Sequence, residues 1–522
     1  MAHAAQPRVT SLTQQHRRNR NNETLATLAM FGLGLMVAAV GYRMGGFYFP
    51  IAGTVLAVGA VAILCKPILG IYLTVLFALI GDAPTASWYP FGLNFSSRES
   101  ILFLHDALTF TPIELYLGAT TVAWLAGLAG SRQARIEGRP VVWAVAVFGT
   151  MLMAGLFYGV FLRGGNLTIA IWESRPMFYL PVMFVLVTNL FTRTAHYTYL
   201  AIVAACALLV HELIAIGHYW SLDGVERADL ESLTEHAASV HYNWVFLLLL
   251  GLLLFHGTSR WARMLLALLA IPTGYVMLLS QRRAGIVALA LGFMVFSLVL
   301  LYRRRAAFFA LVPAVLIVTG GYTAAFWNST SGVGFGAQAI KTVVAPSEVN
   351  EHDASSNVYR IIENYNLVYT LRTEPATGVG FGRPFLQPIR LPDISFFVFY
   401  EYIPHNSVLW VWLKTGYLGF VSLLVMIALT LRAGLRAALT VPSGNQLAIT
   451  VAALGYVAMY FVFAYVDIAW DARSTLFLAS CMAACANMAR LSTAERDPQA
   501  EAEHSNLRRQ VARRHPLAGV PR

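Results

Sequence analysis

Long apolar segments, separated by short polar ones, recur along almost the whole chain and limit what it can fold into. Each is close to the roughly 20 residues that a helix needs to cross the ~30 Å hydrocarbon core of a bilayer. Hydrophobic residues make up 57% of the 522 residues and charged residues only 12%, about half the charged share of an average soluble chain. The sequence therefore predicts an all-α, polytopic transmembrane protein.

About 14 membrane spans are expected from the apolar segments. They lie near residues 24–42, 47–65, 67–82, 110–130, 140–161, 174–192, 196–217, 242–257, 261–280, 284–302, 306–326, 406–431, 446–467 and 473–490. The chain then divides into a polar cytoplasmic N-terminus (1–23), spans 1–11 (24–326), a large loop (327–404), spans 12–14 (405–490) and a cytoplasmic C-terminal tail (491–522).

The basic residues between the spans predict which side of the membrane each loop faces. Lys and Arg are concentrated in cytoplasmic loops. If the N-terminus is cytoplasmic, the clusters Arg17–Arg18 and Arg303–Arg305 fall inside, and the acidic stretch Asp223–Glu235 falls outside. The net charge of +11 then reflects membrane topology, and we expect no nucleic-acid partner.

Two of the outer segments differ from ordinary connectors. Ser280–Arg283 is very short and carries two arginines, against the charge rule for outer loops. Residues 327–404 form a loop of a length that is usually functional or disordered. Within it, apolar residues at helical spacing from Val358 to Leu371 predict a helix, with capping residues at Asp353–Ser356 and a stop at Pro375. We therefore expect this loop to be ordered.

Arginines on the predicted outer side are the first candidates for a binding role. A guanidinium stays charged and binds phosphate oxygens in a bidentate fork, so several arginines around one pocket would suit a diphosphate. Alternatively, each arginine contacts lipid headgroups or balances acidic residues in the loop. This alternative fits Arg282 and Arg283 least well, because they oppose the charge rule for outer loops. The candidates are Arg163, Arg175, Arg282, Arg283, Arg360, Arg372, Arg383 and Arg390.

His405 and Lys414 begin one predicted span and are the next candidates. His405 follows Pro404, so unpaired backbone N–H groups and the positive end of the helix dipole lie close by. That environment favours a neutral imidazole, which could act as a general base, although a capping histidine at the lipid interface fits equally well. Lys414 lies about 13 Å further along the helix, where it would line a cavity or form a structural ion pair.

Other patterns give little support for a cofactor. The glycines of Gly378–Gly382 do not join a strand to a helix, which argues against dinucleotide binding, and the sequence contains no Walker A motif. Several outer side chains could be considered as metal ligands, but their spacing matches no compact ligand pattern: His211, Glu212, His218, His236 and His241. We predict no cofactor and no metal.

Three segments, taken in order, resemble the O-antigen ligase and O-antigen polymerase superfamily of bacterial membrane glycosyltransferases. The similarity covers most of the membrane part and is best from about residue 270 to 430. The segments are Ser280-Gln-Arg-Arg-Ala-Gly285, the large loop with Arg360 and Pro375-Ala-Thr-Gly-Val-Gly-Phe-Gly382, and His405-Asn-Ser-Val-Leu-Trp with Lys414-Thr-Gly-Tyr-Leu-Gly419. Arg163-Gly-Gly-Asn-Leu167 and Glu173–Leu180 also resemble a segment of these proteins.

The resemblance implies an inverting, metal-independent enzyme at the periplasmic face of the bacterial inner membrane. It implies transfer of glycan from undecaprenyl diphosphate to lipid A-core or to a growing polysaccharide. Arg360, with Arg282 or Arg283, would bind the diphosphate and stabilise the leaving group, and His405 would deprotonate or orient the acceptor hydroxyl. The further outer arginines that could assist in diphosphate binding are Arg163 and Arg175.

Other functions stay open at this point. Fourteen spans also suit a transporter or flippase, but the two halves show no clear repeat and a large ordered outer loop is not typical of transporters. A protein O-oligosaccharyltransferase would use the same class of donor. A non-catalytic assembly scaffold is the third alternative. Transfer of a lipid-linked glycan accounts best for the outer arginines together with His405.

Overall fold

The computed structural model describes residues 48–82, 84–129, 136–228, 230, 232–255, 260–329, 332–345, 351–392 and 399–496. These residues form helices and loops, with no strand among them. The all-α, multi-pass membrane fold that the sequence predicts is therefore confirmed. The first expected span, near 24–42, and the N-terminal segment 1–23 lie outside the described residues, as does the tail beyond residue 496.

The helices follow the predicted spans in order. They are α2 (Tyr48–Cys65), α3 (Ile68–Ile80), α4 (Pro112–Ala129), α5 (Val141–Phe157) with the π-helix η1 (Tyr158–Leu162), α6 (Leu167–Leu190), α7 (Thr194–Ser221), α8 (Gly224–Ala228), α9 (Ala238–Leu254), α10 (Arg260–Ser280), α11 (Arg283–Arg303), α12 (Arg305–Ala325), the 3₁₀-helix η2 (Gly332–Gly334), α13 (Phe335–Val344), α14 (Glu351–Thr373), α15 (Ser407–Thr440), α16 (Asn445–Val466) and α17 (Ala472–Arg496).

The predicted number of membrane crossings can be compared with the helices of the structure. Nine helices in the described part of the chain are long and apolar enough to cross a membrane. Four shorter apolar helices coincide with further predicted spans: Ile51–Cys65, Ile68–Ile80, Ala238–Leu254 and Leu266–Ser280. The total of about 14 spans therefore stays a prediction.

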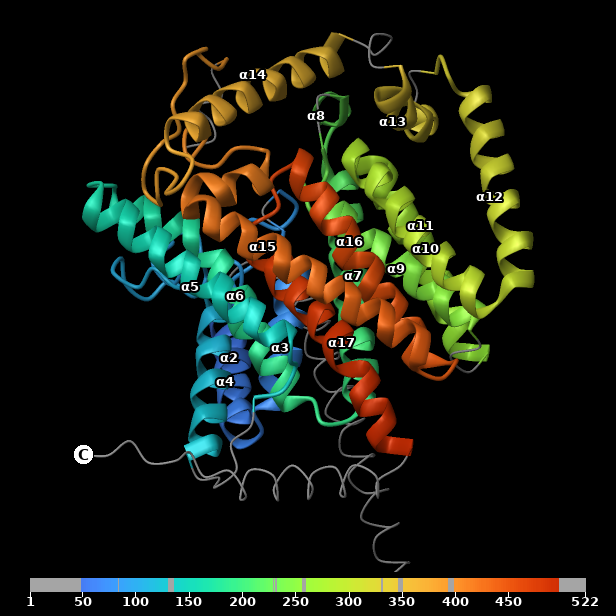
Figure 1. Ribbon diagram of the computed structural model, residues 1–522, viewed down its shortest axis with the longest axis horizontal. Coiled ribbons are helices and arrows are strands. Elements are labelled where there is room, and N and C mark those ends of the chain that lie inside the picture. The colour runs from blue at the N-terminus through green and yellow to red at the C-terminus, as the bar shows by residue number, and fades with distance from the viewer. Residues whose placement is uncertain are drawn as a thin grey trace, which may run out of the picture.

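Helices α16 and α17 form the centre of the bundle (Figure 1). In each of these helices, 83% of the most apolar 18-residue stretch is buried inside the protein. The buried residues of α17 are mostly small, including Ser474, Ala479, Cys481, Ala484 and Cys485. Small residues let helix backbones approach closely, which is how helices pack in a membrane, where lipid removes the hydrophobic driving force between them.

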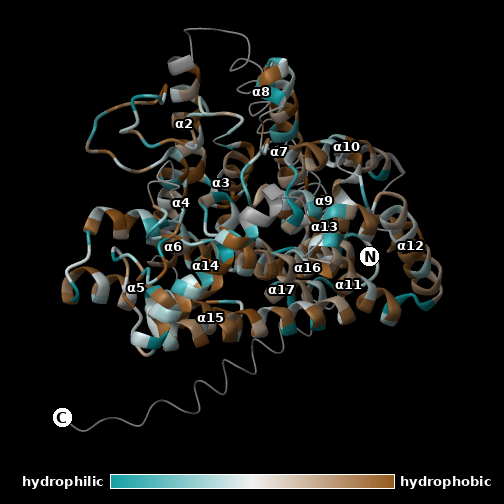
Figure 2. Cartoon of the chain, turned by 90° about the horizontal axis from the view of Figure 1, so that it is seen from above, coloured by the Kyte–Doolittle hydropathy of each residue, from teal (hydrophilic) through white to brown (hydrophobic). Residues whose placement is uncertain are grey.

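Helix α12 lies at the edge of the bundle in both views (Figures 1 and 2). None of its residues is buried. Residues 316–321 are exposed without interruption, and because six consecutive residues cover all sides of a helix, the middle of α12 is uncovered all round. The helix is coloured mostly as hydrophobic in Figure 2, and its exposed apolar side chains are suited to contact with lipid.

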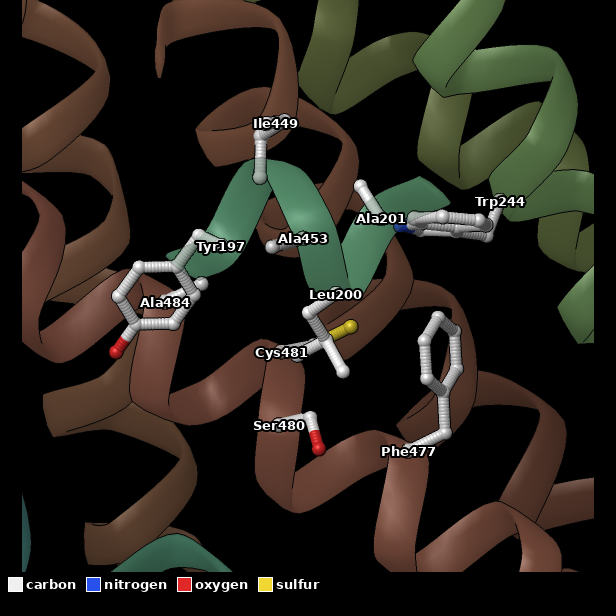
Figure 3. Close-up of a pocket in the computed structure, with 10 residues that line it drawn as sticks. All are labelled: Tyr197, Leu200, Ala201, Trp244, Ile449, Ala453, Phe477, Ser480, Cys481 and Ala484. Carbon is white, nitrogen blue, oxygen red and sulfur yellow. The ribbon is translucent and has the colours of Figure 1, made fainter. Parts of the chain in front are cut away.

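A small apolar pocket lies inside the bundle between α7, α9, α16 and α17 (Figure 3). Its volume is about 20 Å³, which is room for roughly one water molecule. Tyr197, Leu200, Trp244 and Phe477 are among the side chains around it. The pocket is too small and too apolar for a sugar or a diphosphate, and we regard it as a packing void.

The large loop is ordered where it is described, and its predicted helix is α14. This helix, with α13 and α8, lies at one end of the bundle, which we call the loop face (Figure 1). Much of its apolar stripe points outward, since Val358, Ile361 and Tyr365 are 52%, 68% and 54% exposed. Glu363 and Asn366 are buried, together with the apolar side chains of Leu367 and Leu371. Polar side chains of α14 therefore face the protein among apolar ones, which indicates polar partners beneath the helix.

The glycine-rich segment after α14 connects this loop to the membrane helices. Gly380 has a φ of 82°, and a Cβ atom there would overlap with the backbone of Gly159 in η1. Gly416 breaks the regular helix of α15 with φ 70°, which lets the N–H of Tyr417 donate to the carbonyl of Ala376 at 3.0 Å. Glycine is required at both positions because its backbone adopts positive φ without a steric penalty.

We expect Gly380→Ala to destabilise the protein by about 2 kcal/mol or more, because it combines a strained φ with a backbone overlap. Thermal unfolding of the detergent-solubilised protein measures the effect. Gly118→Ala is the matched control, since nothing lies within 4 Å of a Cβ at that helical position. Equal melting temperatures for the two variants would contradict the proposed tight contact.

Candidate functional site

His405 is held at the loop face by the capping of α15 and by a buried carboxylate. The Asn406 side chain accepts a hydrogen bond from the N–H of Leu409 at 3.0 Å, so α15 starts immediately after His405. The Nδ1 atom of His405 lies 3.2 Å from Oε1 of Glu363, and its backbone N–H donates to Oε2 at 3.0 Å. Glu363 thus fixes both the ring and the backbone of His405, and this arrangement directs the other ring nitrogen away from the carboxylate.

Asp467 joins two cationic side chains at the same end of the bundle. It follows the last residue of α16, with its side chain 2% exposed. Its Oδ1 atom lies 2.7 Å from Nδ1 of His236, and its Oδ2 atom lies 3.5 Å from Nη2 of Arg360. Burial alone would raise the pKa of Asp467, but the positive charges of His236, Arg360 and His405 outweigh it and lower the pKa below its usual range.

These five residues form one group, which we call the histidine cluster: His236, Arg360, Glu363, His405 and Asp467. The imidazole rings of His236 and His405 are 6.2 Å apart between centroids and nearly perpendicular, at 66°. The Tyr359 ring lies 5.5 Å from that of His405. Such a group combines an imidazole oriented by a carboxylate with a fixed guanidinium, so it can move a proton and bind an anion.

A second ion-pair network supports the segment that carries His236. Arg473, at the start of α17, contacts Asp82 at 3.2 Å and Glu235 at 2.8 Å. The backbone N–H of Glu235 also donates to Asp82 at 3.2 Å. The side chain of Arg473 is 6% exposed and that of Asp82 is fully buried, so the network fixes the end of α3 to the residue just before His236.

The Arg282–Arg283 corner lies beside the same segment. A Cβ atom on Gly285 would collide with Ser239, which is three residues after His236, and the Asn243 side chain donates to the Gly285 carbonyl at 2.7 Å. The Arg283 guanidinium donates to the hydroxyl of Thr342 in α13 at 2.9 Å. The corner is therefore packed against the start of α9, close in the fold to His236.

Arg163 and Lys414 belong to another network, where the glycine-rich segment meets α6 and α15. Arg163 forms an ion pair with Glu374 at 2.5 Å, and the hydrogen bond and charge of Glu374 raise the pKa of Arg163. Lys414 is fully buried and pairs with Glu173 at 2.7 Å. The other oxygen of Glu173 accepts from the N–H of Gly382 at 2.6 Å. Of the two roles that the sequence left open for Lys414, these contacts favour the structural ion pair.

Arg175 lies in a third group, which fastens the segment before α4 to α6. Its guanidinium donates to the carbonyl of Thr109 at 2.5 Å and lies 3.4 Å from Glu114. It also covers the ring of Trp172, 4.5 Å from the centroid. It also lies 3.4 Å from Oδ1 of Asn94. Arg175 has no contact with the histidine cluster among those the structure describes.

The predicted site residues are thus only partly brought together. His405 and Arg360 share one cluster, Arg282 and Arg283 lie at the neighbouring corner, and Arg163, Arg175 and Lys414 serve other networks. Sequence reasoning missed Glu363 and Asp467, and it considered His236 only as a metal ligand. One signal was available, because Glu363 lies one turn after Arg360 on the predicted helix.

The histidines considered for a metal site lie apart in the structure. Within the described residues, no three or more His, Cys, Asp or Glu side chains form a group that could hold a metal ion. His211 contacts the hydroxyl of Tyr242 at 2.7 Å, while Nδ1 of His241 contacts the carbonyl of Ala237 at 2.8 Å. These contacts explain both rings as buried packing residues of α7 and α9.

The fold defines a multi-pass membrane protein with a cluster of two histidines, an arginine and two carboxylates at one end of its helices. Residues 265–424 match the family model described as O-antigen ligase. This match confirms the resemblance to the O-antigen ligase and polymerase superfamily and supports a glycan-transferring role in the membrane, as a ligase or polymerase. No curated protein matches the sequence. The matched segment includes Arg282, Arg283, Arg360 and His405, whereas His236 and Asp467 lie outside it.

We expect Lys414→Met to destabilise the protein by about 3–5 kcal/mol, because it leaves the Glu173 carboxylate buried without its partner. The double variant Lys414→Met with Glu173→Gln should recover a large part of that loss, since no unpaired charge is left. Thermal unfolding in detergent measures all three proteins. A single variant as stable as the wild type would show that the ion pair is not structural.

Proposed function

We propose that this protein is a glycosyltransferase that moves a glycan from undecaprenyl diphosphate to lipid A-core at the periplasmic face of the bacterial inner membrane. The observation that supports this most directly is the pairing of His405 with Glu363 beside Arg360, inside the segment that matches the O-antigen ligase model. A base and an anion-binding group side by side are what transfer from a lipid diphosphate requires.

In the proposed reaction, the acceptor hydroxyl attacks the anomeric carbon from the face opposite the diphosphate, so the configuration inverts. A bond forms between the acceptor oxygen and the anomeric carbon, and the bond from that carbon to the diphosphate oxygen breaks. The electron pair stays on the diphosphate. His405 takes the proton of the acceptor hydroxyl on Nε2, because Nδ1 is engaged by Glu363.

Arg360 binds the leaving diphosphate in this mechanism, with Arg282 or Arg283 as the second cationic partner. A guanidinium aimed at the oxygens where negative charge develops lowers the barrier to bond cleavage. Arg360 is well suited to this because its ion pair with Asp467 is long, at 3.5 Å, so its donors are not all engaged. The arginines take the part that a divalent cation plays in many other transferases.

Three classes of acceptor fit the proposed reaction. The description of the matched family favours a ligase, which uses lipid A-core, over a polymerase, which uses another glycan. A protein acceptor, as in O-oligosaccharyltransferases, is the third possibility. Deletion of the gene separates a ligase from a polymerase, because loss of a ligase leaves long polymer on the carrier lipid and loss of a polymerase leaves single repeat units.

Arg360→Ala and His405→Ala should each reduce glycan transfer by at least about 100-fold, because one removes an anion-binding group and the other the base. Transfer from purified undecaprenyl-diphosphate-linked glycan to acceptor in detergent measures the effect, and product formed there also excludes a transporter, since no compartments exist. Arg372→Ala is the control for α14, because Arg372 is exposed on the same helix. Wild-type transfer by both site variants would remove this mechanism.

Chelation provides an independent test of how the diphosphate is bound. We expect excess EDTA to leave the transfer rate of the purified enzyme within about twofold, because arginines neutralise the diphosphate in the proposed site. The control is a cation-dependent transferase assayed in the same buffer. Complete loss of activity that Mg²⁺ restores would contradict binding by arginines alone.

A further inference from the structure

His236 is the member of the histidine cluster that the mechanism so far leaves unused. Its position resembles that of His405, because each histidine lies two residues before the first residue of a helix, α9 or α15. Each ring also places Nδ1 against a carboxylate whose side chain is 2% exposed, Asp467 for His236 and Glu363 for His405. The cluster therefore contains two histidine–carboxylate pairs with ring centroids 6.2 Å apart.

Both carboxylates also accept a backbone N–H group. Glu363 accepts that of His405 at 3.0 Å, and Oδ1 of Asp467 accepts that of Ile468 at 2.9 Å. The side chains that contact the two oxygens of Asp467 in the described structure are those of Arg360, at 3.5 Å, and His236, at 2.7 Å. The shorter contact is the one to His236. A buried carboxylate in this setting is stabilised by a charged imidazole.

The charge of the cluster depends on the protonation of His236. Arg360 contributes one positive charge, while Glu363 and Asp467 contribute two negative ones, so the cluster is negative when both histidines are neutral. Around the His236 segment, Arg473 is matched against Asp82 and Glu235, and the neighbouring corner carries the positive charges of Arg282 and Arg283. Within the cluster the two carboxylates would repel a diphosphate, and a protonated His236 would offset the charge of the carboxylate that it faces.

We propose that His236 is a second catalytic residue, which binds a leaving oxygen of the diphosphate as an imidazolium while His405 removes the proton of the acceptor. This inference rests on the proposed function. Its Nδ1 atom faces Asp467, and its side chain is 35% exposed, so Nε2 is the nitrogen that donates to the substrate. When the bond to the anomeric carbon breaks, the electron pair stays on the diphosphate oxygen, and the N–H of His236 stabilises it.

The variant His236→Asn tests this role, because an amide keeps a hydrogen-bond donor for Asp467 but carries no charge. We expect its rate of glycan transfer to fall by about 100-fold. The wild-type rate should fall as the pH is raised, because the proposed donor must carry a proton. That basic limb should be missing in His236→Asn and shifted to higher pH in His236→Lys, whereas the acidic limb should be kept.

The binding of undecaprenyl diphosphate alone gives a second measurement that needs no variant to turn over. Wild-type affinity should weaken as the pH rises, and His236→Asn should bind about tenfold more weakly at acidic pH without that dependence. His218→Asn is the matched control, because His218 lies at the end of α7 outside the cluster, and it should behave as the wild type does.

Three outcomes would overturn the assignment. The first is a wild-type rate and pH profile in His236→Asn. The second is a loss of rate with both limbs unchanged, which indicates a structural role only. The third is wild-type binding of undecaprenyl diphosphate that does not depend on pH. Failure of the wild type to transfer glycan to any of the three acceptors would instead refute the proposed function itself.

Discussion

The carboxylate of Asp467 is buried at the end of α16, and the organisation of the site depends on how its charge is balanced. Removing such a charge from water costs several kcal/mol unless cations compensate for it. Arg360 comes from α14 and His236 from the segment before α9, so the balance draws two distant parts of the chain to one point. The hydroxyl of Ser407, two residues after His405, donates a hydrogen bond to the Asp467 carbonyl, which links the start of α15 to the same turn.

This arrangement explains why α14 turns charged residues inward while Val358, Ile361 and Tyr365 stay exposed. In a soluble domain that stripe would be expected to face the core. Here the protein beneath α14 contains charged groups that need partners. Glu363 and Arg360 satisfy that need from the inner side of the helix, where apolar residues of α14 are buried as well. The amphipathic pattern alone therefore does not identify the inner side of this loop helix.

Sequence reasoning predicted the helices well because apolar length is a strong and local signal. It singled out His405 and Arg360 as candidates because they lie in segments with a recognisable order, and the structure places both in one cluster. It could not separate Arg163, Arg175 and Lys414 from them, since the side of the membrane is the only geometry that topology supplies. Their assignment to other networks depends on partners far away in sequence, such as Glu374 for Arg163 and Glu173 for Lys414.

The same limit applies to Asp467 and His236, which belong to no predicted motif and lie outside the segment that matches the family model. Each is an isolated polar residue at the end of a helix, and only the packing of α9 and α16 brings the two within 2.7 Å. The segment that matches the family model therefore does not contain the whole histidine cluster, which needs the helices on either side of it. A fragment limited to residues 265–424 would retain Arg360 and His405 but lack the carboxylate that balances the first and the imidazole that faces the second.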